Sequence, residues 1–309
     1  MSEYHRPIME GEVVEGLCVK AGGVYFDGTL GGGGHSFAIL SANPTATLLA
    51  TDKDNEAIQE ATRRLAPFEG RYQIFHSDFK NFQEVFAQAG VEKIDGFLLD
   101  LGISSHQIDD EKRGFAYRLK NAPLDMRMDQ TKALSAHEVV NTYPEEALKR
   151  ILKEYGEERF AANIAKNIVK YRSKKPVETC GELEEIVRGS IPAKLRSAAC
   201  ARQSFQAIRI EVNGELEGLG ECVRELVKSL KKGGRGCVLT FHSLEDRIVK
   251  QTFKDLSTGC TCPKEFPVCV CGRKAQVKLL GRYTASESEI RENSRSKSAK
   301  LRVIEKISE

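Results

Sequence analysis

The 309-residue sequence predicts a doubly wound α/β fold, with a Rossmann-like parallel sheet interrupted by an inserted helical domain. Three observations support this prediction. Short apolar stretches that end in an acidic residue alternate with segments of helical spacing, as in parallel α/β proteins. Four consecutive glycines, Gly31 to Gly34, follow the first of these stretches. Residues 110–212 carry helical patterns only, so we expect residues 1–109 and 213–309 to form two parts of one sheet domain.

The composition indicates a globular protein and limits its class. Hydrophobic residues make up 40% of the chain, which is enough for a core. No stretch approaches the roughly 18 apolar residues of a membrane span, so no membrane partner is expected. Residues 1–7 are too polar and too short for a secretory signal, which predicts a cytoplasmic location. The net charge of +3 is too small to indicate a nucleic-acid partner by itself.

The glycine run has the pattern of a nucleotide-binding loop. Residues 24–27 form an apolar stretch ending in Asp27, and a segment of helical spacing begins directly after Gly34. Glycines allow positive φ and close approach of the backbone to a ligand, and the first N–H groups of the helix can donate to it. Thr29 stands where the acid-x-G-x-G-x-G loop of S-adenosylmethionine (SAM) enzymes has its first glycine. A simple turn is the alternative.

Acidic residues follow each of the first four predicted strands. Asp27, Asp52, Asp78 and Asp100 all fall at carboxyl ends of strands, where parallel α/β sheets bind ligands. Asp52 lies about twenty residues beyond the loop, at the position of the acid that accepts hydrogen bonds from ribose hydroxyls. The alternative is a solvated turn acid. Nicotinamide enzymes also carry the first two acids, whereas the last two suit an adenine amino group and a methionine ammonium and so favour SAM.

The remaining elements follow from spacing and capping signals. We expect strands at residues 45–51, 71–75, 94–102, 236–241, 277–280 and 301–307. Helices are expected at residues 82–89, 144–156, 160–169 and 216–230, after Asn55 as an N-cap, and after capping boxes at Ser135/Glu138 and Thr179/Glu182. Residues 231–234 should end the 216–230 helix. Residues 103–129 are turn-rich without a clear period, which indicates a functional loop.

Seven longer motifs extend along nearly the whole chain. They are HRPIM (5–9), DGTLGGGGHS (27–36), LDLGISS (99–105), PLDMRMD (123–129), FQAIRI (205–210), VNGEL (212–216) and FHSLEDR (241–247). In this order they resemble the motifs of the bacterial RsmH (MraW) family. Members of that family are SAM-dependent methyltransferases that place a methyl group on N4 of a cytidine in the decoding centre of 16S ribosomal RNA. The resemblance implies this activity and SAM as the cofactor.

The resemblance also implies roles for individual residues. SAM would be held by Gly33, Gly34, His35, Asp52, Phe79, Asp100 and Gln107. Because a cytosine amino group is a poor nucleophile, the protein must mainly position the reactants and exclude water. The candidates for orienting the base are Asp100, Asn213, His242 and His5, with an ordinary structural hydrogen bond as the alternative for the two histidines.

A catalytic motif known from other amino methyltransferases is missing. Enzymes resembling this fold use an Asn/Asp/Ser-Pro-Pro-aromatic motif after the fourth strand, whereas residues 100–103 read DLGI. The mechanism of those enzymes therefore does not carry over residue by residue.

Two basic stretches predict where RNA is held. Residues 166–175 contain five cations and residues 191–210 contain four, without an acidic residue in either. Phosphate contact is the favoured interpretation, and a solvated helix face is the alternative. The candidate RNA-binding residues are Arg127, Lys174, Lys175, Arg196, Arg202 and Arg209. The expected partner is 16S ribosomal RNA or the small ribosomal subunit, with the target cytidine extruded from its stack. A homodimer is left open.

Nine cysteines in an irregular pattern indicate reduced thiols or metal ligands. Cys260, Cys262, Cys269 and Cys271 form two C-x-C pairs. In extended chain, residues i and i+2 face the same way, so a hairpin turned at residues 263–267 would bring four thiols together, which suits structural Zn²⁺. Reduced thiols packed in a loop are the alternative, and no catalytic role is expected for them.

Two other classes of protein stand as alternatives to a SAM-dependent RNA methyltransferase. A nicotinamide oxidoreductase would share the sheet and the first two acids, but would show changes in cofactor absorbance and no methyl transfer. A non-catalytic RNA-binding protein would bind ribosomal RNA and leave it unmodified.

Overall fold

The computed structural model describes residues 7–262, 268 and 270–309. They form two compact units: a sheet unit, Met1–Gly102 with Gly218–Glu309, and a helical unit, Ile103–Glu217. Each unit has its own hydrophobic core. Three sequence predictions concern parts outside the described residues, namely His5, Cys269 and the turn at residues 263–267.

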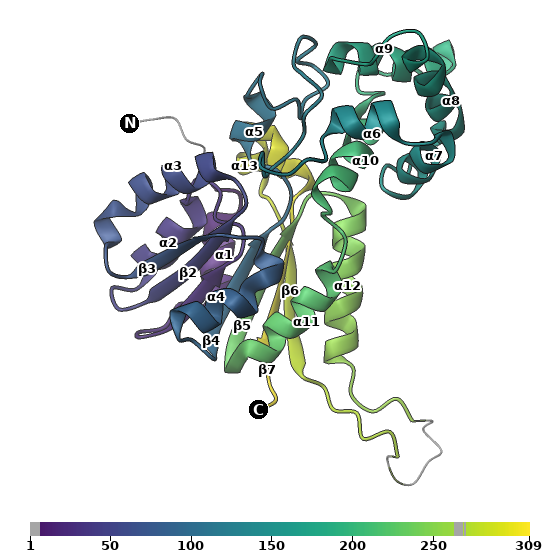
Figure 1. The fold of residues 1–309 in the computed structure, drawn as a ribbon. Coiled ribbons are helices and arrows are strands. Elements are labelled where there is room, and N and C mark those ends of the chain that lie inside the picture. The colour runs from purple at the N-terminus through teal and green to yellow at the C-terminus, as the bar shows by residue number, and fades with distance from the viewer. Residues whose placement is uncertain (1–6, 263–267, 269) are drawn as a thin grey trace. The chain divides into compact units, whose positions relative to one another are not determined.

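The sheet unit contains, in the described residues, a seven-stranded sheet of order β3-β2-β1-β4-β5-β7-β6 (Figure 1). The strands are β1 (Val24–Asp27), β2 (Thr47–Asp52), β3 (Tyr72–His76), β4 (Ile94–Asp100), β5 (Leu230–Thr240), β6 (Val277–Thr284) and β7 (Lys300–Lys306). Strands β1 to β5 pair in parallel, while β7 lies antiparallel between β5 and β6. The strand order reverses between β1 and β4, and such switch points are where open α/β sheets bind ligands.

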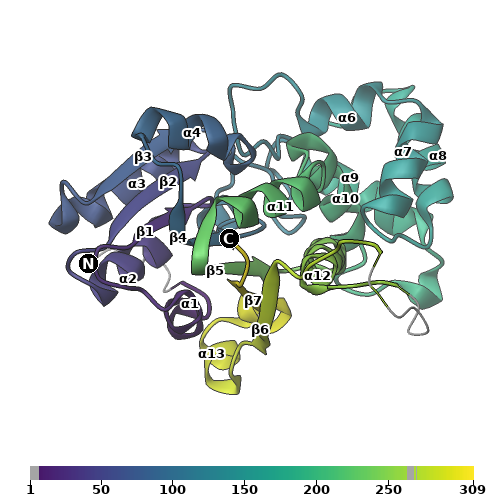
Figure 2. The ribbon, with the colours of Figure 1, turned by 90° about the horizontal axis from the view of Figure 1, so that it is seen from below.

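Helices cover both faces of this sheet, which confirms the doubly wound α/β prediction. They are α1 (Glu10–Leu17), α2 (Gly34–Ala42), α3 (Asn55–Leu65), α4 (Phe82–Ala89), α11 (Leu219–Ser229), α12 (Ser243–Ser257) and α13 (Glu287–Glu292), with 3-10 turns η1 (Ala66–Phe68), η2 (Phe79–Asn81) and η4 (Ser294–Ser298). Helices α1, α2 and α3 bury Leu17, Leu40 and Leu65 in one core cluster. Helices α4, α11 and α12 contribute to the other, and Figure 2 shows α1 and α2 on the opposite side of the sheet from α4 and α11.

Several elements of the sheet unit differ from the sequence prediction, among them α13, which was not predicted, and β6, which extends to Thr284. The fifth strand begins at Leu230 instead of residue 236, because Lys231 and Lys232 continue the strand with their side chains exposed. The N-cap of α3 is Asp54, whose carboxylate accepts from the backbone N–H two residues on, so Asn55 is the first residue of the helix and not its cap. Helix α12 is absent from the prediction, although its apolar residues recur at helical spacing.

The helical unit consists, in the described residues, of short helices around one core (Figure 1). They are α5 (Ser105–Asp109), α6 (Ala136–Thr142), α7 (Glu145–Glu154), α8 (Ala161–Arg172), α9 (Cys180–Ser190), η3 (Ala193–Leu195) and α10 (Arg202–Asn213). Thr179 forms the predicted capping box with Glu182, and the Ser135 hydroxyl accepts from the Glu138 N–H at the start of α6. No helix in the described parts of either unit is both long and apolar enough to span a membrane.

Close packing fixes the carboxyl end of β1 against its neighbours. Gly28 follows β1, and its N–H donates to Leu98 O of β4 at 2.9 Å. A Cβ atom added to Gly28 would lie 2.5 Å from Leu99 Cδ2 and 2.8 Å from Phe79 Cβ. The residue after β1 therefore has to be glycine for steric reasons, independently of any ligand.

We predict that Gly28→Ala destabilises the sheet unit by about 1–3 kcal/mol, because an extra methyl group in a filled core forces neighbouring side chains to move. Chemical denaturation of the two proteins measures the difference. Gly11→Ala is the matched control: Gly11 lies in α1 with nothing within 4 Å of an added Cβ, so alanine there should stabilise by about 0.5 kcal/mol. Equal effects of the two substitutions would contradict the packing argument.

Candidate functional site

The loop between β1 and α2 is held by Asp27, the last residue of β1. Its buried carboxylate accepts hydrogen bonds from Ser36 Oγ at 2.7 Å and from the Thr29 N–H at 3.1 Å. Burial raises the pKa of this carboxyl. Gly31 and Gly33 have φ values of 50° and 75°, a region that favours glycine, and Gly33 is the N-cap of α2. The loop therefore connects β1 to α2, and the first N–H groups of α2 have no partner within the helix.

Asp52, the last residue of β2, contacts the same loop. Its Oδ2 accepts from the Gly31 N–H at 2.7 Å, and its Oδ1 accepts from the Asp54 N–H at 2.9 Å. Burial is the largest influence on its carboxyl and raises the pKa of Asp52 to about 6. The group thus changes charge near neutral pH at the position expected of a ribose-binding acid.

Asp100, the last residue of β4, lies on the other side of the loop. Its N–H donates to Thr29 Oγ1 at 2.6 Å, so the residue in place of the usual glycine links the loop to β4. Its Oδ2 lies 3.4 Å from Nε2 of His35, in the first turn of α2. Burial lowers the pKa of His35, but the contact with the Asp100 carboxylate and the negative charges of Asp27 and Glu10 together outweigh it, so the pKa is raised above its ordinary value.

Three buried polar atoms beside this loop have no hydrogen-bond partner in the described part of the chain, namely Asp100 Oδ1 and the two ring nitrogens of His35, of which Nε2 lies beside the Asp100 carboxylate. Buried polar groups in proteins are nearly always paired, so such atoms call for an explanation. A polar ligand bound at the carboxyl ends of β1 and β4 would supply the missing partners.

Two further predicted cofactor residues have structural contacts of their own. Phe79, in η2, is mostly buried and packs in the core between the sheet and α4. Burial raises the pKa of the preceding Asp78, but Lys53, at 3.2 Å, and Lys80 together outweigh it and hold the pKa below its ordinary value. Gln107 belongs to the helical unit, where its Oε1 accepts from the Ser104 N–H and completes the capping box of α5.

Asn213, the last residue of α10, uses its amide to hold the PLDMRMD motif. Its Oδ1 accepts from the Met128 N–H and its Nδ2 donates to Met126 O, both at 2.8 Å. Met126 has a φ of 58°, which is uncommon for a residue with a side chain. Arg113, which sequence reasoning missed, is fully buried and donates to Met128 O at 3.1 Å. An arginine next to a glycine in a turn-rich segment gave no signal of this contact.

His242 follows β5 and is the N-cap of α12. The Glu245 N–H donates to its Nδ1 at 3.5 Å, and Glu245 Oε2 accepts from the His242 N–H at 3.3 Å, which together form a capping box. Its Nε2 lies 3.0 Å from Glu245 Oε1. This geometry agrees with the structural alternative for His242.

The six candidate RNA-binding residues, all in the helical unit, have different surroundings. Arg127 and Arg209 each form a two-bonded ion pair with a neighbouring carboxylate. Lys175 pairs with Glu182 at 2.6 Å. The other three are exposed, and no carboxylate in the described residues pairs with them: Lys174, Arg196 and Arg202. Of the six candidates, these three combine exposure with an uncompensated charge.

The sheet and the loop together define the class of fold. A doubly wound sheet with an antiparallel β7 inserted between β5 and β6, and a glycine loop with acids at the ends of β1, β2 and β4, is a Rossmann-like methyltransferase sheet. The chain belongs to the MraW methylase family, whose pattern it matches over residues 2–307.

Relatives match the chain over almost its whole length. The Ribosomal RNA small subunit methyltransferase H of Geobacter sp. (strain M21) is 52% identical over 98% of this chain and 99% of that protein. The protein of the same name from Clostridioides difficile (strain 630) is 46% identical over 99% of this chain and 100% of that protein. A solved structure of a putative rRNA-methylase from Clostridium thermocellum is 12% identical and aligns over 96% of this chain and 94% of that chain with a TM-score of 0.43, which is too low to bear on function.

We predict that Asn213→Ala destabilises the helical unit by about 2–3 kcal/mol, because it leaves the buried Met128 N–H and Met126 O without partners. Chemical denaturation followed by circular dichroism measures the change. Asn121→Ala is the control, since Asn121 is exposed in the same unit and should shift stability by less than about 0.5 kcal/mol. Unchanged stability of Asn213→Ala would mean that the loop is held by other contacts.

Proposed function

We propose that this protein transfers a methyl group from SAM to N4 of a cytidine in 16S ribosomal RNA, at the position conventionally numbered 1402. Membership of the MraW methylase family over nearly the whole chain carries the proposal. The names of the relatives support ribosomal RNA of the small subunit as the substrate. The choice of base and atom rests on the resemblance of the motifs.

The residues at the ends of β1, β2 and β4 fit SAM as the cofactor. The half-buried Asp52 carboxylate can accept hydrogen bonds from ribose hydroxyls, and the unpaired Asp100 Oδ1 can accept one from the methionine ammonium. Gly33, Gly34 and His35 open α2, where N–H groups are available to a ligand. Phe79 and Gln107 stay candidates for cofactor binding on the resemblance alone. When bound, SAM supplies an electrophilic methyl group on a positively charged sulfur.

The chain's own contribution is to bind, orient and exclude water, because the methyl donor is already reactive. Asp100 keeps a buried acceptor oxygen unpaired in the described residues, so we assign it hydrogen bonding at the cofactor's methionine end and the orientation of the reacting groups. Asn213 holds a loop and His242 caps a helix, so both are positioning residues in this proposal. His5 stays a candidate on the resemblance alone.

The helical unit is proposed to bind the RNA backbone. Lys174, Arg196 and Arg202 are exposed cations without carboxylate partners in the described residues, which suits phosphate contacts. Arg127, Lys175 and Arg209 are engaged by carboxylates, so we propose that they shape the surface and contribute less charge to RNA binding.

Methyl transfer to the small ribosomal subunit tests the proposed function. Labelled SAM is incubated with small subunits that lack the modification, and the nucleosides of the RNA are analysed. N4-methylated cytidine should appear with the intact protein and not with Asp100→Ala. Label on another nucleoside would overturn the base assignment, and no label on subunits or naked RNA would favour a binding-only protein.

The raised pKa of Asp52 predicts pH-dependent cofactor binding. Below pH 6 the carboxyl binds a proton, and the charged acceptor for the ribose hydroxyls becomes neutral. Affinity for the product S-adenosylhomocysteine should therefore fall by about fivefold between pH 7 and pH 5, which corresponds to the difference of about 1 kcal/mol between charged and neutral hydrogen bonds. Isothermal titration calorimetry measures it.

Asp52→Asn is the control for this pH dependence. It should bind more weakly at pH 7 and show a flatter profile from pH 7 to pH 5, because the asparagine amide gains no proton over that range. A profile of the variant as steep as that of the unchanged protein would assign the titration to another group.

Salt dependence tests the three exposed cations. Replacing Lys174, Arg196 and Arg202 by alanine should weaken RNA binding and lower the slope of log K against log salt by about 0.7 for each phosphate that the variant no longer neutralises. Replacing Lys149, Arg150 and Lys153 of α7 removes the same charge from a helix where Glu146 and Glu154 already pair with two of the cations. An equal decrease of slope in both variants would indicate a general charge effect instead of a binding surface.

A further inference from the structure

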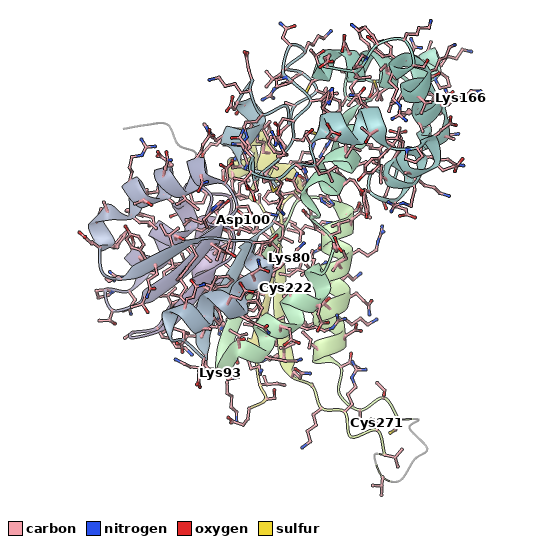
Figure 3. The ribbon with its side chains drawn as sticks, in the orientation of Figure 1. Lys80, Lys93, Asp100, Lys166, Cys222 and Cys271 are labelled. Atoms are coloured by element: carbon pink, nitrogen blue, oxygen red, sulfur yellow. The ribbon has the colours of Figure 1, made fainter. Side chains whose placement is uncertain are left out.

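Two groups of cysteines in the described residues have different surroundings. Cys180, Cys222 and Cys237 are buried among apolar side chains, and burial raises the pKa of Cys180 and Cys222 to about 12. Such thiols are inert packing residues. Cys260, Cys262 and Cys271 are instead exposed or half-buried, and Figure 3 shows Cys271 on the segment that extends beyond α12 and β6, apart from Cys222 in the body of the sheet unit.

The segment that carries these three cysteines has no hydrophobic core in its described residues. Between the end of α12 and the start of β6, none of the described side chains from residue 257 to residue 276 is buried. Val268 and Val270 are 69% and 72% exposed. A segment that buries so little apolar surface needs another source of order, and disulfides and metal ions are the usual ones.

Both ends of this segment are fixed to the sheet unit. Arg273 Nη2 donates to Asp255 O in the last turn of α12 at 2.5 Å. The Gln276 N–H donates to Leu256 O at 2.8 Å, just before β6 begins. The outgoing and returning chains are therefore held close together next to the cysteines, which lowers the entropy cost of bringing the thiols to one ligand.

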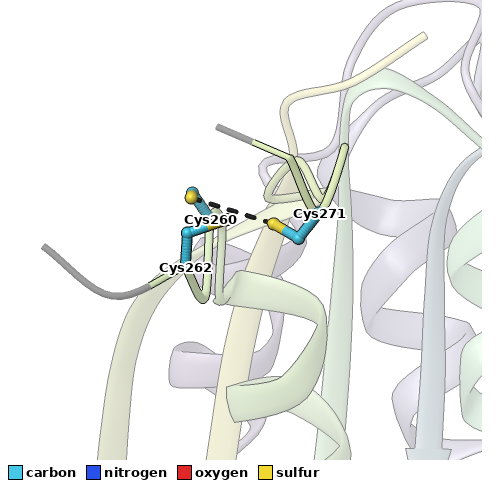
Figure 4. Close-up of side chains that lie close together, drawn as sticks. All are labelled: Cys260, Cys262 and Cys271. Atoms are coloured by element: carbon cyan, nitrogen blue, oxygen red, sulfur yellow. Dashed lines mark hydrogen bonds between the residues drawn. The ribbon is translucent and has the colours of Figure 1, made fainter. Parts of the chain in front are cut away.

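The three sulfur atoms lie together at the base of the segment. All three are within 4.8 Å of one another, and Cys260 Sγ is 3.8 Å from Cys271 Sγ (Figure 4). The Val270 N–H donates to Cys262 Sγ at 3.4 Å. Figure 4 shows Cys260 and Cys262 on one part of the chain and Cys271 on another, so the cluster links the outgoing and returning segments.

We infer that Cys260, Cys262 and Cys271 bind a structural Zn²⁺ ion that joins the chain leaving α12 to the chain entering β6. Thiolates are soft ligands that select Zn²⁺, and tetrahedral coordination leaves one position for a fourth ligand. Each thiol releases its proton on binding, and no electron transfer is needed. A disulfide between two of these residues would leave the third thiol, and its clustering with them, without a role.

Metal content of the full-length protein tests this inference. Protein purified in reducing buffer without added metal should contain about one Zn²⁺ per chain by elemental analysis. Cys260→Ser, Cys262→Ser and Cys271→Ser should each lower that content at least about tenfold after dialysis against a weak chelator. Cys18→Ser is the matched control, because Cys18 is an exposed cysteine outside the cluster, and it should keep the zinc.

Cobalt and trypsin provide readouts that do not depend on purification history. Titration of the metal-free protein with Co²⁺ should give thiolate-to-cobalt charge-transfer absorption that saturates at one equivalent and is absent in the three cluster variants. Removal of the metal should speed trypsin cleavage after Arg273 and Lys274, since the segment then loses its main constraint.

Three outcomes would overturn the inference. One is protein without stoichiometric zinc that also gives no charge-transfer band with Co²⁺. Another is a disulfide between Cys260 and Cys271 in protein isolated under reducing conditions, detected as a mass decrease of two hydrogens by mass spectrometry. The third is zinc retained by the cluster variants but absent from Cys18→Ser, which would place the metal elsewhere.

Discussion

The buried carboxylate of Asp27 is the constraint on which the candidate cofactor site depends. A buried acid needs hydrogen-bond donors, and Asp27 takes them from Thr29 in the loop and from Ser36 in α2. Thr29 in turn receives the Asp100 N–H of β4 through its hydroxyl. One side chain at the end of β1 thereby fixes the loop and α2, and through Thr29 also β4. It therefore sets the positions of the groups proposed to bind the cofactor.

The same principle decides the role of several polar residues in the helical unit. Asn213 and Arg113 direct their side chains at the backbone of residues 126–128, where Met126 has an unfavourable φ. Such a loop keeps its shape only when its surroundings over-determine it. A polar residue in a family motif can thus serve the site by fixing a loop, without touching a substrate.

The segment between α12 and β6 does not depend on hydrophobic burial in its described residues. The sheet unit is stable through its two apolar clusters, whereas this segment buries no described side chain and collects thiols in their place. With zinc bound as inferred, metal coordination takes the place of hydrophobic burial around the three thiols.

The sequence by itself determined the fold class, most element positions and the acids at the strand ends, because these depend on local periodicity and on the direction of parallel strands. The sequence also showed where the cations lie along the chain, but not which carboxylates pair with them. Only the tertiary structure decided that Arg209 is neutralised by Glu215 while Arg202 is not, that His35 meets Asp100, and that Thr29 joins two strands. Asp100 is distant in sequence from both His35 and Thr29, and Arg202 and Arg209 are two arginines of the same helix that the sequence does not distinguish. Packing decides these contacts, and no local sequence pattern predicts them.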